Sequence, residues 1–194
     1  MDDGAQGSID FDELMDQYFG KIFNVIYRLM GDYEEARDLT QDTFIQAYKA
    51  LPYFRGESKV YTWLYRIAVN RCKNRLKQMQ RRGEMVTESL DQPLETEDGE
   101  LQREVADWSY SPEVLLERRE LQRLVQREIG RLPHDFKEVV VLRDLQGLTY
   151  KEISEVLHIS VEAVKSRLFR ARSLLRERLR PYLEGFEGPW LERG

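Results

Sequence analysis

The sequence predicts an all-α protein made of two small helical domains that a flexible acidic linker joins. Gly and Pro are sparse, at 12 and 6 of 194 residues, and no run alternates β-branched with polar residues, so strands are not indicated. Apolar residues recur at helical spacing in two blocks, 8–83 and 111–180. Between them, in 84–110, residues 87–107 hold eight Asp/Glu and one Arg. Such a segment cannot bury enough surface to offset its ordering entropy.

The first block predicts three helices. Apolar residues from Phe11 to Met30 follow the spacing of a long amphipathic helix, which Gly31 ends. Asp32 is a capping signal for a second helix, and Pro52 stops that helix. After a loop at 53–58, a third helix is expected from about residue 59 to about residue 80.

The second block predicts two helices before a helix-turn-helix. Ser111, Pro112 and Glu113 form a helix start, because Ser caps, Pro suits the first position and Glu favours the dipole. That helix should end at Pro133, and the next at Gly147. The remaining residues, 181–194, form a tail in which Tyr182, Phe186 and Trp190 dock on the second domain, bind a partner or stay disordered.

The stretch 148–179 has the pattern of a DNA-binding helix-turn-helix. Thr149 and Glu152 form a capping box, His158-Ile159-Ser160 is the turn, and Ser160 caps the second helix. The buried face of this second helix should carry Val161, Val164, Leu168, Ala171 and Leu175, and its polar face Lys165, Ser166, Arg167, Arg170 and Arg172. A polar, basic second helix suits the major groove. The alternative is an ordinary helical hairpin with a solvated face. It is disfavoured because 161–180 hold seven Lys/Arg and two Asp/Glu in a chain of net charge -5.

The third helix of the first block has a chemistry of its own. Residues 66–82 hold seven Lys/Arg and no acid. One stripe carries Arg66, Asn70, Lys73, Asn74 and Lys77, and the aromatic residues nearby are Phe54, Tyr61 and Tyr65. Cations follow a phosphate backbone while aromatic rings and amides meet unstacked bases, so this surface suits single-stranded DNA. Taken alone, a solvated helix with its aromatic residues in the core explains the pattern equally well. A separate helix-turn-helix in the same chain favours the DNA interpretation.

Several classes of function are disfavoured by what the sequence lacks. Cys72 is the single cysteine, so the chain can form neither an internal disulfide nor a Cys-rich metal site. His134 and His158 are isolated, and there is no Gly-rich phosphate loop. We therefore expect no catalytic residues, no metal, no cofactor and no enzymatic activity. The N-terminal segment has no signal-peptide features and no apolar run could span a bilayer, which predicts a cytoplasmic protein without membrane insertion.

Three stretches in this order resemble bacterial sigma factors of the extracytoplasmic-function group, sigma-E type. They are DLTQDTFIQAYKAL at 38–51, FRGESKVYTWLYRIAVNRCKN at 54–74 and LTYKEISEVLHISVEAVKSRLFRAR at 148–172. The resemblance covers about residues 11–179. It implies sigma region 2 in 8–83 and sigma region 4 in 111–180. It also implies the function, which is to bind core RNA polymerase and to direct transcription initiation at specific promoters.

The resemblance also implies site residues. The face that reads the duplex -35 element corresponds to Lys165, Ser166, Arg167, Phe169 and Arg170. The surface for the single-stranded -10 element corresponds to Phe54, Arg55, Tyr61, Arg66, Asn70, Lys73 and Asn74. The polymerase-binding surface corresponds to Asp38, Gln41, Asp42 and Phe44. An anti-sigma factor is a further expected partner, and the chain should be a monomer outside its complexes. From the residues alone, Phe169 either touches a thymine methyl group or packs at the edge of the core.

A second class of function remains open from the sequence. A helix-turn-helix regulator with a helical sensor domain would bind duplex DNA without polymerase, normally as a dimer on a palindrome. Nothing in the sequence resembles a dimerisation helix or a ligand pocket. Run-off transcription with core polymerase, with and without the protein, distinguishes the two classes.

Overall fold

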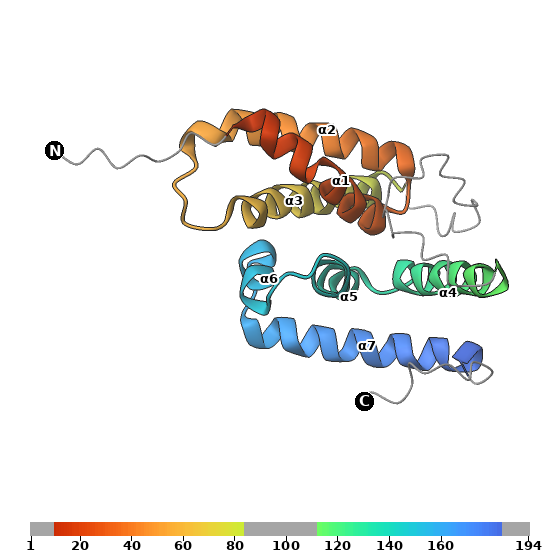
Figure 1. Ribbon diagram of the computed structural model, residues 1–194. Helices are drawn as coiled ribbons and strands as arrows, with labels where there is room; N and C mark the ends of the chain where they lie inside the picture. Colours follow the sequence, from red (N-terminus) through yellow and green to blue (C-terminus); the bar gives the residue numbers. More distant parts are fainter. Residues whose placement is uncertain (1–9, 84–111, 184–194) are drawn as a thin grey trace. The chain divides into compact units, whose positions relative to one another are not determined.

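The computed structural model describes residues 10–83 and 112–183, without the side chains of 112–119 and 183. Helices and short turns make up these residues and no strand occurs in them, which confirms the all-α prediction (Figure 1). The predicted acidic linker at 84–110 and the tail residues Phe186 and Trp190 lie outside the described residues.

The helices form two compact units. The first unit contains α1 (Phe11–Met30), α2 (Tyr33–Ala50), the short 3-10 helix η1 (Leu51–Tyr53), α3 (Val60–Arg82) and all but the first residue of the eight-residue α6 (Tyr150–Leu157). The second unit contains α4 (Pro112–Gly130), α5 (His134–Val140), η2 (Val141–Leu145) and α7 (Val161–Leu183).

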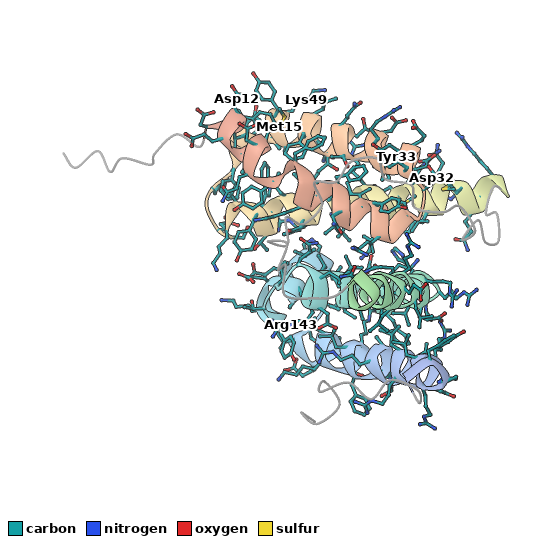
Figure 2. The ribbon with its side chains drawn as sticks, turned by 45° about the vertical axis from the view of Figure 1, so that its right-hand side comes forward. Asp12, Met15, Asp32, Tyr33, Lys49 and Arg143 are labelled. Carbon is teal, nitrogen blue, oxygen red and sulfur yellow. The ribbon has the colours of Figure 1, made fainter. Side chains whose placement is uncertain are left out.

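Local capping signals set both ends of α1 and the start of α2, and those at Gly31 and Asp32 are the ones that the sequence predicts. The Asp10 carboxylate accepts a hydrogen bond from the Asp12 backbone N–H at 2.8 Å. Gly31 ends α1 with a left-handed φ of 78°, a conformation that glycine adopts without strain. The Asp32 carboxylate, directly before the first residue of α2, Tyr33, accepts a hydrogen bond from the Glu35 N–H at 2.8 Å (Figure 2). These caps provide partners for backbone groups that a helix end leaves unpaired.

The core of the first unit lies among α1, α2 and α3, which pack on one another pairwise. α1 contributes five buried aliphatic residues, Leu14, Ile22, Val25, Ile26 and Leu29. α3 contributes Trp63, Leu64, Ile67, Ala68 and Cys72. Two threonines of α2, Thr40 and Thr43, are fully buried, and each hydroxyl donates to the carbonyl four residues earlier at 2.7 Å. Their polar groups are therefore satisfied inside an apolar core.

The second unit differs from the prediction in one helix. The sequence indicates one regular helix between Pro133 and Gly147, but α5 gives way to the π-helical turn η2 at Val141. In this turn the Gln146 N–H donates to the Val141 carbonyl, five residues back, at 3.1 Å. Four consecutive residues are buried here, namely Val139, Val140, Val141 and Leu142. A regular α-helix spreads four consecutive side chains over most of its circumference, so this segment is covered on nearly all sides.

The long helix α7 packs on α5 and α4 and closes the second unit. Its buried residues are Val164, Leu168 and Ala171, as predicted, while Val161 and Leu175 are half-buried. The helix continues to Leu183, past Pro181 in its last turn. The spacing of the buried residues leaves the opposite face of α7 in solvent.

Candidate nucleic-acid interface

A tight turn joins α6 to α7, as the sequence predicts. The Ser154 hydroxyl donates to the Ile159 carbonyl at 2.5 Å, and the Ile159 N–H donates back to the Ser154 carbonyl at 3.2 Å. Between them His158 has a left-handed φ of 55°, which is unusual for a residue other than glycine. The Ser160 hydroxyl accepts from the Ala163 N–H at 3.1 Å, which confirms Ser160 as the cap of α7.

Four side chains form an outward face near the start of α7, which we call the reading face: Lys165, Ser166, Phe169 and Arg170. All four are exposed, and Phe169 is 74 % exposed. Phe169 therefore does not pack at the edge of the core. Lys and Arg can meet the acceptors of guanine, and an aromatic ring can meet a thymine methyl group. The reading face thus presents both polar and apolar side chains to solvent.

Arg167, also predicted to contact DNA, is placed differently from these four. It is half-buried, and its Nη2 lies 2.8 Å from Oδ2 of Asp135 on α5. Arg172, further along α7, makes two contacts with the Asp144 carboxylate, at 2.5 and 3.2 Å. Both guanidinium groups have protein partners in the structure. The reading face is therefore narrower than the sequence predicted.

The basic stripe of α3 is present as predicted. Asn70, Asn74 and Lys77 are exposed, whereas Arg66 and Lys73 are half-buried. The two asparagines lie one helical turn apart, and each amide carries both a donor and an acceptor. This stripe can offer hydrogen bonds to base edges beside cations for the phosphates.

Tyr65 does not belong to this surface. It is 3 % exposed, with its ring edge-to-face with Tyr61 at 6.5 Å between centroids. Burial, together with the neighbouring Tyr18 and Tyr61, raises the pKa of Tyr65. Of the two interpretations that the sequence leaves open for the aromatic residues near this helix, the structure supports a core position for Tyr65. Tyr61 itself is half-buried and stacks on Tyr18 at 6.3 Å.

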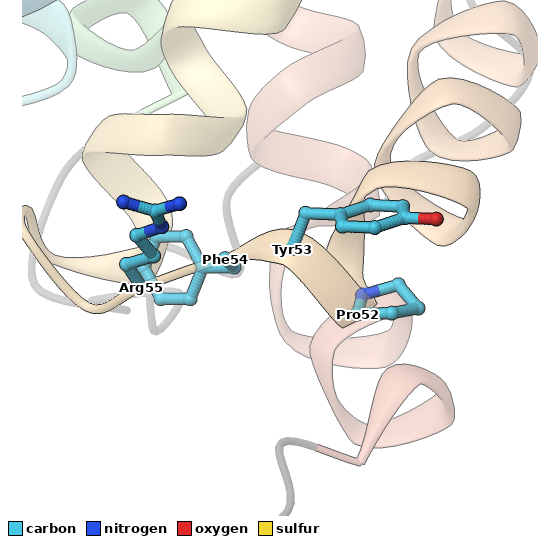
Figure 3. A pocket seen from close by; sticks show the side chains of 4 residues that line it. All are labelled: Pro52, Tyr53, Phe54 and Arg55. Atoms are coloured by element: carbon cyan, nitrogen blue, oxygen red, sulfur yellow. The ribbon is translucent and has the colours of Figure 1, made fainter.

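The loop before α3 forms an open hollow. Its lining side chains are Pro52, Tyr53, Phe54 and Arg55 (Figure 3). Phe54 is half-buried, and the centres of its ring and the Trp63 ring are 5.1 Å apart. This contact packs the loop against the core. Arg55 is exposed, and Tyr53 is 83 % exposed. Sequence reasoning did not select Tyr53, although an aromatic residue directly after a helix-stopping proline was a usable signal.

The third predicted surface lies on α2. Asp38, Gln41 and Asp42 are exposed, as expected for residues that meet a partner. Phe44 is 4 % exposed; it stacks on Phe19 at 5.7 Å and meets Phe11 edge-to-face at 6.3 Å. The prediction of Phe44 as a direct contact is therefore wrong, because its ring points into the core.

Two apolar residues on α2 were missed by the sequence reasoning. Ile45 is 53 % exposed and Tyr48 is 64 % exposed. The signal was present, because both fall off the buried stripe of Leu39, Thr43, Phe44 and Ala47. Elsewhere on α2, the Arg71 guanidinium of α3 donates to Gln46 at 2.8 Å and lies 3.7 Å from the Asp42 carboxylate. This surface therefore combines carboxylates, amides and apolar side chains.

Metal-binding clusters and membrane-spanning helices do not occur in the part of the chain that the structure describes. Over 10–83 and 112–183, no group of three or more His, Cys, Asp or Glu side chains could hold a metal ion. No helix in these ranges is both long enough and apolar enough to cross a membrane.

Comparison with known proteins assigns both parts of the chain to described families. Residues 14–82 match "Sigma-70 region 2", and residues 122–175 match "Sigma-70, region 4". The RNA polymerase sigma-H factor of Pseudomonas aeruginosa is 40% identical over 176 residues, which is 89% of this chain and 88% of that protein. The ECF RNA polymerase sigma-E factor of Escherichia coli K12 is 36% identical over 173 residues, with coverage of 89% and 88%.

Two solved structures share the fold. The sigma factor RpoE of Bartonella quintana, in complex with the anti-sigma factor NepR, superposes with a TM-score of 0.65 at 21% identity, covering 88% of this chain and 97% of that one. CnrH, in complex with the cytosolic domain of CnrY, superposes with a TM-score of 0.61 at 24% identity, covering 88% of each chain. At such identities the likeness concerns the fold alone.

Proposed function

Because this chain belongs to the sigma-70 family of RNA polymerase sigma factors, and within it to the extracytoplasmic-function group, we propose that it binds core RNA polymerase and opens promoters that it reads through two separate DNA surfaces. The observation that carries this proposal is the exposed reading face on α7, where Lys165, Phe169 and Arg170 project from the helix that follows the turn after α6. The basic stripe on α3 is the second DNA surface, and its chemistry suits single-stranded rather than duplex DNA.

The proposed domain boundaries are those expected from the sequence, and the two family matches support them. Region 2 occupies 8–83 and region 4 occupies 111–180. Residues 84–110 link them, and 181–194 form a tail. The match to region 2 at 14–82 lies within the three helices α1 to α3, and the match to region 4 at 122–175 ends within α7.

Region 4 is proposed to read the duplex -35 element. Exposure of Lys165, Ser166, Phe169 and Arg170 supports this role for the reading face. Arg170 is the residue best suited to a guanine, because a guanidinium can meet the O6 and N7 acceptors together. Arg176 and Arg180 are also exposed on α7, and we assign them to the phosphate backbone, which carries affinity rather than sequence preference.

Region 2 is proposed to hold the single-stranded -10 element. Asn70 reads an extruded base, Asn74 and Lys73 lie next to it on α3, and Phe54, Arg55, Tyr61 and Arg66 complete the surface. Exposure of the Asn70 and Asn74 amides supports this assignment. The exposed ring of Tyr53 in the neighbouring hollow adds a platform on which a base can stack.

The polymerase contact is proposed on α2. Asp38, Gln41 and Asp42 supply the polar contacts, and Ile45 and Tyr48 supply apolar area beside them. Phe44 supports this surface from beneath, through its packing on Phe19. A mixed surface of this kind is typical of protein interfaces, where buried apolar contacts are bordered by polar ones.

Regulation and location complete the proposal. Two proteins of the same fold were solved in complexes, one with an anti-sigma factor and one with a cytosolic domain. We therefore assign an anti-sigma factor to this chain as a partner. The protein acts in the cytoplasm, is not an enzyme and is a monomer outside its complexes.

Run-off transcription tests the function. Core polymerase is supplied with promoter fragments, with and without the protein, and transcript length reports the start site. We expect a discrete transcript only when both are present, and weak binding of the isolated protein to duplex promoter DNA. Tight, specific binding of the isolated protein to a palindrome, without a polymerase-dependent transcript, would instead establish a conventional helix-turn-helix regulator.

A further inference from the structure

The segment formed by α5 and η2 contacts both flanks of the reading face on α7. On one flank, Asp135 of α5 pairs with Arg167 at 2.8 Å. On the other, Asp144 of η2 holds Arg172 through two hydrogen bonds, at 2.5 and 3.2 Å. Two independent ion pairs thus connect one short segment to the helix that carries the DNA-reading residues.

Helical geometry shows that these pairs bracket the reading face. An α-helix has about 3.6 residues per turn, so each residue advances by about 100°. Viewed along the axis of α7, the order around the exposed side is Arg172, Lys165, Phe169, Ser166, Arg170 and Arg167. The two paired arginines are therefore the borders of the arc, and the four reading residues occupy its middle.

The π-helical turn is itself held in place near this contact. Arg143, next to Asp144 and labelled in Figure 2, donates from Nη1 to the Leu148 carbonyl at 2.7 Å. Its guanidinium also lies 5.0 Å from the centre of the Tyr150 ring. The hydrogen bond to Asp144, with further contributions that include Tyr150, raises the pKa of Arg172. Neighbouring side chains of one turn thus secure both the loop before α6 and the flank of α7.

We propose that Asp135 and Asp144 are positioning residues for -35 recognition, which set the rotation of α7 about its axis by pairing with Arg167 and Arg172. Neither aspartate needs to touch DNA in this role. Base readout is sensitive to such a rotation, because a bidentate contact requires both donors to meet their acceptors at once. The ion pairs also keep Arg167 and Arg172 directed toward α5 and η2, so that these cations do not add contacts that favour every sequence equally.

This inference rests on the proposed function, and one experiment separates the two. Holoenzyme is assembled from core polymerase and the full chain, and transcription is measured from a promoter with the best -35 element and from single-base variants of it. The discrimination ratio is the transcription from the best promoter divided by the transcription from a single-base variant. This ratio is compared between the parent protein and the double variant Asp135→Asn/Asp144→Asn. Glu177→Gln is the matched control, because Glu177 is an exposed acid on α7 with no ion pair among the described residues.

We expect the double variant to lower the discrimination ratio by about threefold, the scale set by two partly exposed ion pairs. Transcription from the best promoter should fall by a smaller factor than the discrimination ratio, because removal of two acids does not weaken binding to the phosphates. The control should keep the parent ratio. An unchanged ratio in the double variant overturns the inference, while absence of any transcript with the parent protein overturns the proposed function instead.

A charge swap distinguishes positioning from direct contact. Asp144→Arg places two cations side by side and should lower discrimination, and the addition of Arg172→Asp restores an ion pair of reversed polarity. We expect this second change to recover the ratio. If Arg172 acts by touching DNA, the added aspartate lowers it further, and that result also overturns the inference. Circular-dichroism melts of each variant show whether the fold is retained.

Discussion

Arg170 offers the sharpest test of -35 recognition. The change is Arg170→Ala, which removes one guanidinium from the reading face of α7. Arg170 is exposed, and no ion pair with it occurs in the part of the chain that the structure describes. The substitution therefore leaves the buried residues of α7 in place, and the free energy of unfolding should change by no more than about 0.5 kcal/mol.

The magnitude of the functional effect follows from the contact that Arg170 is proposed to make. A bidentate contact to guanine discriminates against the wrong base by about 1–3 kcal/mol. Since about 1.4 kcal/mol corresponds to a factor of ten, the preference at one base pair should fall by about fivefold to about a hundredfold. Preferences at the other -35 positions should persist, because Lys165, Ser166 and Phe169 keep their places.

A library of promoters with randomised -35 elements, transcribed by holoenzyme, measures this preference at every position. Arg176→Ala is the matched control, since Arg176 is an exposed arginine of the same helix outside the reading face. We expect the control to weaken all sequences evenly and to reduce the salt dependence of binding. If Arg170→Ala also lowers all sequences evenly, Arg170 is a phosphate contact and base readout belongs to the remaining residues of the reading face.

Four further outcomes are expected. Asn70→Ala should reduce promoter opening and blur preference at one -10 position, while equal loss on every -10 variant would indicate a backbone contact. Asp42→Arg should weaken co-purification with core polymerase at nearly unchanged stability, and a normal holoenzyme yield would contradict the assignment. Phe44→Ala should cost about 3–5 kcal/mol in a denaturant melt because the ring is buried, whereas a surface residue would cost far less. The hydrogen bond from Arg75 lowers the pKa of Glu35 below its ordinary 4.5, so this pair stabilises the fold above that pH and the stabilisation is lost on acidification. The Tm of Glu35→Gln should therefore fall less below about pH 4.5 than the Tm of the parent protein. An equal fall in both proteins would contradict a stabilising role for this ion pair.

The sequence by itself determined the helical class and many of the helix ends. Asp32 and Ser160 cap their helices as predicted, and Gly31 ends α1. These features depend on residues within a few positions of one another, so the local chain contains the information. The exposed position of Phe169 was also predictable, because it falls off the apolar stripe of α7.

Only the tertiary structure decided which polar and aromatic side chains remain available to a partner. Phe44 and Tyr65 lie on helix faces that other helices cover, so both are core residues rather than contacts. Arg167 and Arg172 looked equivalent to Arg170 in the sequence, but α5 and η2 supply the aspartates that hold them. The π-helical turn that places Asp144 was not indicated either. The ion pairs of Arg167 and Arg172 join residues about 30 positions apart in the chain, and packing alone brings those residues together.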